Sequence, residues 1–481
     1  MKKLLSLALL CMLAASVVNA KNFTEINTDK AKALIDAAIE AHGGEALLED
    51  LRTLIVETST INYSVDQSRG TEAPWDTSNN ESIDAIDLER SIFVNRAKGD
   101  GGGFEFHNST IINGDESYQL NLRAGTVAKI TEPDYDTSSG PFIRVTPALL
   151  LRTMKDREAN AYFLGETRIA GVDYNVVGFS MTVGPAISMY FEKGTNLLRR
   201  SERVFPGFGL VEYRFDDYVE KRGVIYNESF TLYLNGDVNL EREIKSVRIN
   251  VPLDDLLEVP ATLVSIPEQQ PDPLSRQELA DGVWLIGGNG TYAMFVDMGD
   301  YIFAAGGTAG IPDRIDSLRE VAGDKAIRYG MLTHHHFDHV LGVTAYEEEG
   351  ATVIAAKAHE RIARRAAEDG ERLNLKLVDD SMTLESNGRR IEIIDIGPTA
   401  HTEHLLVAWL PEEGILFEAD HFAMPQAGPV PPAVTSTKTF AKALAAKGLN
   451  AKHIVSAHSP RPGTPEDLEA ALNREEYRAA R

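Results

Sequence analysis

Cysteine is almost absent from this sequence, because Cys11 is the single one among 481 residues. It lies within the first twenty residues, so a chain cleaved after that segment would contain no thiol. Such a chain can form no disulfide bond and offers no thiolate to a metal ion. Its stability must therefore come from hydrophobic cores, and its length suffices for two domains or more.

Positive charge is also scarce. The chain has 48 Lys and Arg residues against 72 Asp and Glu residues, which gives a formal net charge of -24. Nucleic acids and anionic membranes bind basic patches, so this balance argues against both as partners. After residue 20, no apolar run is long enough to cross a bilayer. We therefore expect a globular protein that acts on a small molecule and has no stable membrane anchor.

The first twenty residues predict a secretory signal peptide. Met1 is followed by two lysines, residues 4–15 form a short apolar core, and the segment ends on the small residue Ala20. A lipoprotein signal needs a small residue before its cysteine, whereas Leu10 precedes Cys11 here. We expect cleavage and a mature protein in the periplasm or outside the cell; an uncleaved anchor is the alternative.

The pattern of apolar residues changes twice along the mature chain. An amphipathic helix capped by Thr28 is expected to end near His42. Short alternating runs separated by turn residues follow, with one helix expected over residues 147–155, which is typical of antiparallel hairpins. A Pro-rich polar stretch then occupies residues 265–273. These changes predict a β-rich α+β domain over residues 21–262, a linker over 263–276 and a second domain over 277–481.

Two stretches of the first domain, Ala41-His42-Gly43-Gly44 and residues 215–224, resemble the periplasmic lipoprotein-carrier-like fold. The resemblance implies a curved antiparallel sheet with helices on its concave side. No cluster of reactive side chains accompanies it, and His42 and His107 are expected to be ordinary surface or turn histidines. The domain is interpreted either as a structural or dimerisation module or as a holder for an apolar part of a substrate.

The most informative stretch reads Thr-His-His-His-Phe-Asp-His over residues 333–339. An apolar strand is expected directly before it and a helix directly after it. Alternate side chains of an extended segment point to opposite faces, so His334 and His336 would face one way and His335 the other. The aspartate and the last histidine would approach from the start of the helix. Imidazole and carboxylate are zinc ligands, so this loop offers two ligand pairs to two adjacent metals.

The spacing His-x-His-x-Asp-His resembles the signature of the metallo-β-lactamase-fold hydrolases. Three later residues extend the resemblance, because each follows an expected strand in the order that the family has. The resemblance implies an αβ/βα sandwich, in which two sheets face each other and helices lie outside. It also implies two zinc ions per chain, with His334, His336 and His401 on the first metal, Asp338, His339 and His458 on the second, and Asp420 bridging the two.

Comparison with the family narrows the expected chemistry. The true β-lactamases of the superfamily carry Cys or Ser at the place of Asp420, whereas thioesterase-like and lactonase-like members carry Asp. The tyrosine that usually follows in lactonases is not evident after Asp420, and the chain ends too soon after His458 for the glutathione-binding extension of the thioesterases. Ala304-Ala305 stand where the family usually has an aspartate that orders the loop under the metals.

The implied metals determine the expected reaction. Two divalent ions about 3.5–4 Å apart share a water and lower its pKa toward neutrality, which supplies hydroxide without a strong base. Asp338 would be the catalytic residue that orients this nucleophile and later carries its proton. The sequence therefore predicts an exported di-zinc hydrolase of an ester, thioester, lactone or related bond. Three alternatives stay open: a β-lactamase- or sulfatase-like hydrolase, a two-iron reductase relative, and a carrier of lipophilic ligands with an accessory metal-binding domain.

The remaining histidines of the second half are expected to have lesser roles. His335 would point away from the site and support the ligands or pack, and His359, which begins an expected helix, would be structural. His404 and His421 lie close to ligands in the sequence and are candidates for lining the substrate pocket. His453 begins a strand and is expected to be exposed.

Overall fold

A computed structural model describes residues 21–206, 209–270 and 272–478. The predicted signal peptide, residues 1–20, lies outside the described residues. The chain divides into two compact units: the described residues up to Leu51 together with Asp136–Asp237, and Arg52–Tyr135 together with the described residues from Val238 onward. These units divide the chain differently from the boundary predicted at residues 263–276, because seven strands of the β-rich region, β1 to β6 and β13, group with the C-terminal region.

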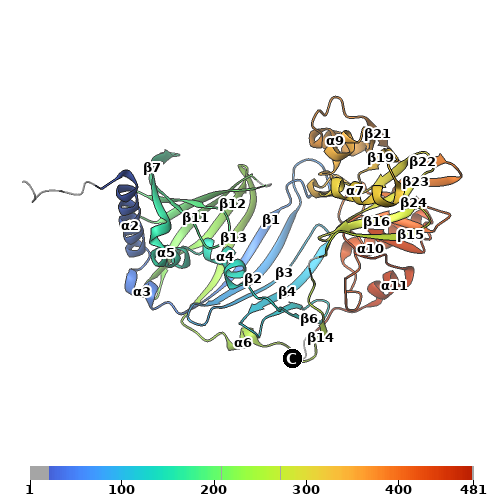
Figure 1. Cartoon of the computed structure of the whole chain (residues 1–481). Helices are drawn as coiled ribbons and strands as arrows, with labels where there is room; N and C mark the ends of the chain where they lie inside the picture. Colours follow the sequence, from blue (N-terminus) through green and yellow to red (C-terminus); the bar gives the residue numbers. More distant parts are fainter. Residues whose placement is uncertain (1–20, 207–208, 271, 479–481) are drawn as a thin grey trace, which may run out of the picture. The chain divides into compact units, whose positions relative to one another are not determined.

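The first unit combines helices with an antiparallel sheet (Figure 1). Its strands pair in the order β12-β11-β10-β9-β8-β7, and helix α2 packs against β7 and α5. The helices are α2 (Phe23–Ala41), α3 (Glu45–Glu49), α4 (Tyr135–Arg144), α5 (Pro147–Asp156) and the 3-10 turn η1 (Glu158–Asn160). The strands are β7 (Ala161–Ile169), β8 (Val172–Phe179), β9 (Ile187–Glu192), β10 (Leu198–Phe205), β11 (Gly209–Lys221) and β12 (Val224–Leu234).

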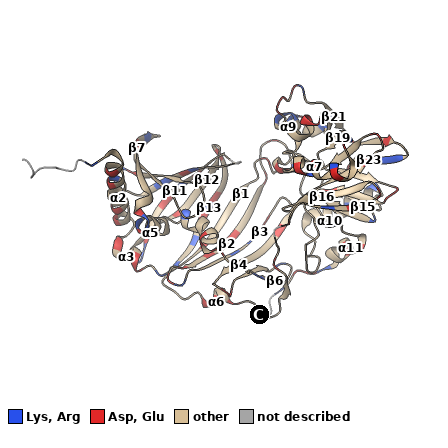
Figure 2. Ribbon diagram, in the orientation of Figure 1, with Lys and Arg blue, Asp and Glu red and all other residues tan. Residues whose placement is uncertain are grey.

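Helix α2 begins earlier than predicted. Its N-cap is Asn22, whose side chain accepts from the Glu25 backbone N–H while the Glu25 carboxylate accepts from the Asn22 N–H. This reciprocal pair satisfies two amides that a helix start leaves free, so it outweighs the single hydroxyl of Thr28, which the prediction had used. The exposed side of the helix carries acidic residues, as Figure 2 shows. Helix α5 lies where a helix was predicted.

His42 lies in the turn after α2, as one predicted alternative had it, but it is buried, so the alternative of a surface histidine is wrong. It caps the end of α2, its Nδ1–H donates to the Ala38 carbonyl at 2.8 Å, and its ring meets Tyr218 edge-on. Burial, assisted by the nearby charge of Arg199, lowers the pKa of His42 to about 4. The imidazole is therefore neutral in the folded protein at pH values where it would be protonated in the unfolded chain.

This lowered pKa predicts a pH-dependent stability. Below the unfolded pKa of about 6.5 the unfolded chain binds a proton that the folded chain does not, so stability is lost as the pH falls from about 6.5 to about 4. The full loss from this residue is about 3 kcal/mol. Urea unfolding of the wild type and of His42→Asn, which keeps a donor near Ala38, should differ in pH dependence across that window. His453→Asn, at an exposed histidine, is the control, and equal slopes in all three proteins would contradict the prediction.

The second unit begins with a mainly antiparallel sheet in the order β14-β6-β5-β4-β3-β2-β1-β13. One face buries a core of aliphatic residues from these strands and from the segment around α6 (Asp254–Leu257). The strands are β1 (Thr53–Tyr63), β2 (Thr77–Asp87), β3 (Ile92–Gly101), β4 (Phe104–Ile112), β5 (Tyr118–Asn121), β6 (Thr126–Lys129), β13 (Asp237–Ile249) and β14 (Val264–Ile266). The resemblance of the whole β-rich region to the lipoprotein-carrier-like fold stays a prediction.

Two connections of this sheet matter below. The β1–β2 loop, Ser64–Asp76, joins strands whose last paired residues are Tyr63 and Thr77. The β3–β4 turn consists of Gly102 and Gly103, between the paired residues Gly101 and Phe104. Both residues of the turn have positive φ, +59° and +84°, which is the backbone of a tight hairpin and the reason for glycine at both places.

The rest of the second unit is an αβ/βα sandwich of two sheets with outer helices, as predicted. One mixed sheet runs β15-β16-β17-β18-β19-β20-β21 and the other β22-β23-β24-β25-β26. The strands of the first sheet are β15 (Ser275–Ala280), β16 (Val283–Gly288), β17 (Thr291–Asp297), β18 (Ile302–Ala305), β19 (Ile327–Met331), β20 (Thr352–Ala356) and β21 (Leu375–Val378). Those of the second are β22 (Ser381–Ser386), β23 (Arg389–Asp395), β24 (Leu406–Leu410), β25 (Ile415–Glu418) and β26 (His453–Ser456).

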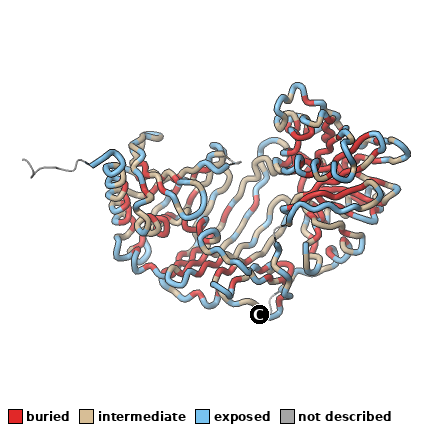
Figure 3. The backbone as a smooth tube through the Cα atoms, viewed as in Figure 1, coloured by how far each residue is buried: buried red, intermediate tan, exposed pale blue. Residues whose placement is uncertain are grey.

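The sandwich is held by three hydrophobic clusters. One lies between the sheets and joins residues such as Met294, Phe303, Ile393 and Phe417. The others attach the outer helices to each sheet, and Figure 3 shows the strands of the sandwich as buried. The helices are α7 (Ile311–Ala322), α8 (Val343–Glu348), α9 (Glu360–Ala366), α10 (Thr435–Lys447) and α11 (Pro465–Asn473), with 3-10 turns η2 (Phe337–His339) and η3 (Lys357–His359).

The chain after the predicted metal motif differs from the prediction. The helix expected directly after the motif is delayed: the 3-10 turn Phe337–His339 is followed by turn residues 340–342, and α8 starts only at Val343. Gly342 explains the delay, since its N–H donates to the Gly307 carbonyl at 2.7 Å instead of joining a continuous helix. In the described part of the chain, no helix combines the length and apolarity that a membrane crossing requires.

Candidate metal centre

The predicted ligands stand at the carboxyl ends of neighbouring strands. The motif follows β19, His401 follows β23, Asp420 follows β25 and His458 follows β26. Loops at one rim of the sandwich therefore bring together all seven side chains, although they span 125 positions of sequence. They form two groups: His334, His336, His401 and Asp420 in one, and Asp338, His339 and His458 in the other.

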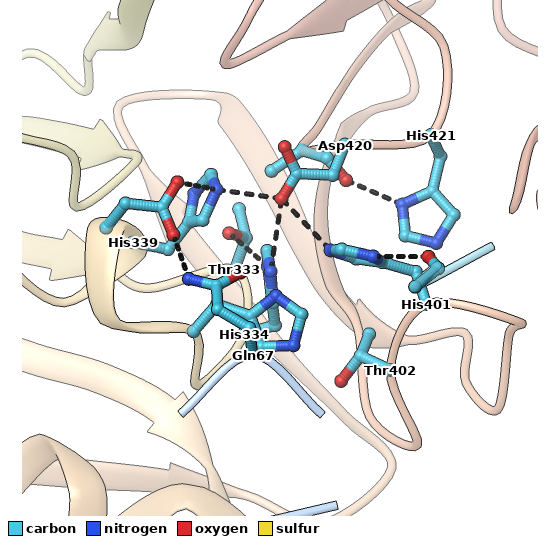
Figure 4. A network of polar contacts seen from close by, with 12 residues as sticks. Gln67, Thr333, His334, His339, His401, Thr402, Asp420 and His421 are labelled. Atoms are coloured by element: carbon cyan, nitrogen blue, oxygen red, sulfur yellow. Dashed lines mark hydrogen bonds and ion pairs between the residues drawn. The ribbon is translucent and has the colours of Figure 1, made fainter. Parts of the chain in front are cut away.

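Asp420 lies between the two groups (Figure 4). Its Oδ2 is 2.7 Å from His339 Nε2, 3.1 Å from His334 Nε2 and 3.3 Å from His401 Nε2, and its Oδ1 is 3.0 Å from His458 Nε2. Burial acts to raise the pKa of Asp420, but the charge and hydrogen bonds of the surrounding imidazoles hold it well below its usual value. The carboxylate is thus ionised and faces ligands of both groups.

The backbone at Asp420 is held in an unusual conformation. Its φ of +64° lies in the left-handed region, where aspartate and asparagine are the most tolerated residues after glycine. The preceding buried Glu418 accepts from the backbone N–H groups of His421 and Phe422, at 3.0 and 3.2 Å, and so fixes the loop around Asp420. Such local strain is found where the surrounding structure determines the position of a functional side chain.

The histidine nitrogens that face the interior of each group are placed to bind a cation rather than to form hydrogen bonds with one another. His336 Nδ1 is buried without a hydrogen-bond partner, and His334 Nε2 makes no hydrogen bond of normal geometry. His458 Nε2 and His339 Nε2 face each other at 3.2 Å. Burial keeps the pKa of His334 and His336 far below the ordinary value. Neutral imidazoles with unpartnered nitrogens beside an ionised carboxylate form a donor set for a divalent transition metal.

Backbone carbonyls fix the other nitrogen of three of these rings. His336 Nε2–H donates to the Ser68 carbonyl at 2.9 Å, and His401 Nδ1–H donates to the Gly102 carbonyl at 2.8 Å. His458 Nδ1–H donates to the Gly290 carbonyl at 3.0 Å. Hydrogen bonds of this kind set the tautomer and orientation of a ligating histidine. Two of the three acceptors belong to the β-rich region, which the sequence did not connect with the site.

The β1–β2 loop lies directly on the metal motif. The Gln67 amide donates to Asp338 Oδ1 at 2.9 Å, and the His335 ring donates to the Gly70 carbonyl at 3.2 Å. Backbone bonds fix the same loop to the site, since Phe337 N–H donates to Asp66 O. This loop therefore forms part of the site. Its sequence contains no side-chain motif that predicts this role.

The β3–β4 turn contacts the other side of the first group. The Gly103 carbonyl accepts from the Ser436 N–H at 2.8 Å, which attaches the turn to the start of α10. A Cβ added at Gly103 would lie 3.1 Å from the Cβ atoms of Ala400 and Ser436, so a side chain there would push the turn away from the site. The glycine run in the sequence signals a hairpin, but it does not reveal which residue the hairpin meets.

Asp338, predicted to be catalytic, lies at the edge of the second group. Its Oδ2 is 3.2 Å from His339 Nε2 and 3.9 Å from His458 Nε2, and 37% of its side chain is exposed. Burial acts to raise the pKa of Asp338, but the hydrogen bond and charge of His339 outweigh it and hold the pKa well below the usual value. An ionised and partly exposed carboxylate can both hold an incoming water and take up its proton.

The other histidines lie mostly as predicted. His335 packs against His359 with ring centroids 4.7 Å apart, behind the ligands. His404 Nδ1 pairs with Asp395 at 2.6 Å, outside both groups. His421 borders the groove described below. His107, by contrast, is half-buried within β4 and does not lie in a turn.

Residues 302–458 match the family model of the metallo-beta-lactamase superfamily, so the C-terminal region is a domain of that superfamily. Similar solved structures include a metallo-beta-lactamase from Pontibacter korlensis, with 18% identity and a TM-score of 0.34, covering 41% of this chain and 97% of the other. The FIM-1 enzyme from Pseudomonas aeruginosa in its mono-zinc form has 23% identity and a TM-score of 0.34, covering 42% of this chain and 95% of the other. No curated protein was found to match.

Proposed function

We propose that this protein is an exported hydrolase that binds two zinc ions and cleaves an ester, thioester, lactone or related bond. The observation that carries the proposal is the pair of ligand groups that share Asp420 between them. His334, His336 and His401 would hold one ion, Asp338, His339 and His458 the other. The basic start and apolar core of residues 1–20 support export to the periplasm or beyond.

The chain's own residues support this chemistry. Two zinc ions would supply an acidified water and polarise the carbonyl of the substrate. Asp338 would orient the attacking water and receive its proton, while Gln67 holds the other carboxylate oxygen in place. The carbonyls of Ser68, Gly102 and Gly290 keep the rings in the ligating orientation. Neither a serine nor a cysteine nucleophile is required.

We expect two zinc ions per chain, because each group supplies a full set of His and Asp ligands. Mass-spectrometric metal analysis of carefully purified mature protein measures this directly, and a count near zero would contradict it. Iron or manganese instead of zinc would change the metal identity only, since His and Asp ligands discriminate weakly. A panel of ester, thioester, lactone, sulfate and β-lactam substrates then identifies the bond, and hydrolysis of the sulfate or β-lactam alone would overturn the proposed substrate group.

A further inference from the structure

A groove of about 510 Å³ opens from the candidate metal centre. Asp420 and His458 border it at the metal end, and its volume lies in the range that holds a small organic ligand. One wall is strand β4, whose residues Phe104, Phe106 and Asn108 alternate and so share one face of the sheet. The opposite wall comes from the segments after β25: His421, Phe422, Ala423 and Val430 to Val434.

The surface next to the metal centre is apolar. The Phe104 ring stands edge-on to His401, with centroids 5.1 Å apart, and 37% of this residue is exposed. Phe106 lies two positions further along the same wall, and Phe422 and Val434 lie among the residues that border the groove. A large aromatic side chain exposed beside a reactive centre marks a surface that gains free energy when a ligand covers it.

The charged residues of the groove walls, apart from the ligand Asp420, are engaged elsewhere. Arg123 donates to the carbonyls of Pro432 and Ala433 at 2.7 and 2.8 Å and pairs with Glu476 at 3.1 Å. Glu105 accepts from the Thr435 N–H at 3.0 Å and from the Thr435 hydroxyl. Arg123 therefore fixes the wall in place and, at 8% side-chain exposure, offers little to a bound anion.

This distribution of apolar and charged residues along the groove favours uncharged substrates over anionic ones. An anionic group lying along Phe104 and Phe106, away from the metal end, would lose its water without gaining a counter-ion from the walls, and Glu105 would repel it. An uncharged apolar group would instead cover Phe104 and Phe106. Binding energy from that remote part of the substrate can be used to lower the barrier at the reacting bond.

We infer that the substrate is an uncharged ester, thioester or lactone whose apolar chain or ring lies along Phe104 and Phe106 of β4. The inference rests on the proposed function and adds that the β-rich region selects the substrate. Phe106 is then a specificity-determining residue, because it would contact the remote part of the substrate.

The test compares Phe106→Ala and Phe106→Leu with the wild-type holoenzyme on p-nitrophenyl acetate and p-nitrophenyl octanoate. We expect kcat/KM on the octanoate to fall about tenfold or more in Phe106→Ala, to recover in Phe106→Leu, and to stay within about twofold on the acetate. Phe205→Ala, at an exposed phenylalanine of β10 that does not border the groove, is the control. An equal change on both esters would overturn the inference.

Two further measurements complete the test. The wild type should prefer p-nitrophenyl pentanoate to the hemisuccinate of similar length, and the reverse preference would contradict the role of charge. Calorimetric binding of N-octylacetamide, an uncharged analogue, should weaken about tenfold in Phe106→Ala, whether or not any ester is hydrolysed. If binding depends on Phe106 but no ester, thioester or lactone is cleaved, the proposed reaction fails and the groove assignment stands; if binding is unchanged, the groove assignment fails.

Discussion

Replacing Asp420 with asparagine should abolish hydrolysis and reduce the bound metal from two ions per chain to one or none. The carboxylate faces four imidazole nitrogens within 3.3 Å and is the charge that both ligand groups share. The amide lacks that charge and would direct an N–H group toward the ligands. We expect kcat/KM to fall about a thousandfold or more, because several kcal/mol of transition-state stabilisation depend on the metals. Activity and metal content are measured on the same preparation.

Asparagine is the appropriate substitution because the backbone of Asp420 has a φ of +64°, which asparagine adopts more readily than alanine. The matched control is Asp395→Asn, at a buried aspartate of the same sandwich that pairs with His404 outside both ligand groups. That variant should keep its metal and change activity by no more than a few-fold. If Asp420→Asn retained two ions and wild-type turnover, the assignment of the centre would be wrong.

Shortening the β1–β2 loop should weaken metal binding without removing any ligand. Residues 64–76 can be replaced by Asn-Gly, because Tyr63 and Thr77 are already paired in register and a two-residue turn closes such a hairpin. The change removes the Ser68 carbonyl from His336 and the Gln67 amide from Asp338. Loss of such outer partners lowers metal affinity about 10–100-fold, and kcat/KM should fall at least as far. Competition with a chelator of known affinity measures the first effect.

Glu72→Ala provides the control within the same loop. The Glu72 side chain is 77% exposed and its nearest cation, on Arg361, is 3.7 Å away, so its removal should leave metal affinity unchanged. Thermal unfolding of the shortened protein shows whether the hairpin change affects the fold as a whole. A shortened protein that folds and binds metal as tightly as the wild type would show that the loop only covers the site.

The sequence predicted the sandwich and the proximity of the candidate ligands because both depend on local patterns. Each ligand follows an apolar run that forms a buried strand, and parallel strands place their carboxyl ends on one rim. Alternation along an extended segment correctly separated His334 and His336 from His335. Helix starts were predicted less well, since Thr28 and Asn22 are both reasonable caps and only the Glu25 side chain decides between them.

The participation of the β-rich region could not be predicted from the same patterns. The residues that meet the ligands, Ser68 and Gly102, act through backbone carbonyls, and no residue type marks that role. Phe104 and Phe106 show the alternation of a strand, but an alternating pattern does not say what its apolar face will contact. Both features arise from contacts between segments about 270 to 330 positions apart in the sequence. Local sequence patterns do not determine which distant segments come into contact.

The use of main-chain oxygens around the centre has a consequence for mutagenesis and for evolution. Every residue type supplies a carbonyl, so an alanine scan of the β1–β2 loop would leave the acceptors at Ser68 and Gly70 present and would report them as neutral if the loop keeps its shape. Inserting or deleting one residue between Ser64 and the acceptor positions would displace both oxygens at once. We therefore expect this loop to tolerate changes of composition, except at Gln67, whose side chain holds Asp338, while its length stays constrained.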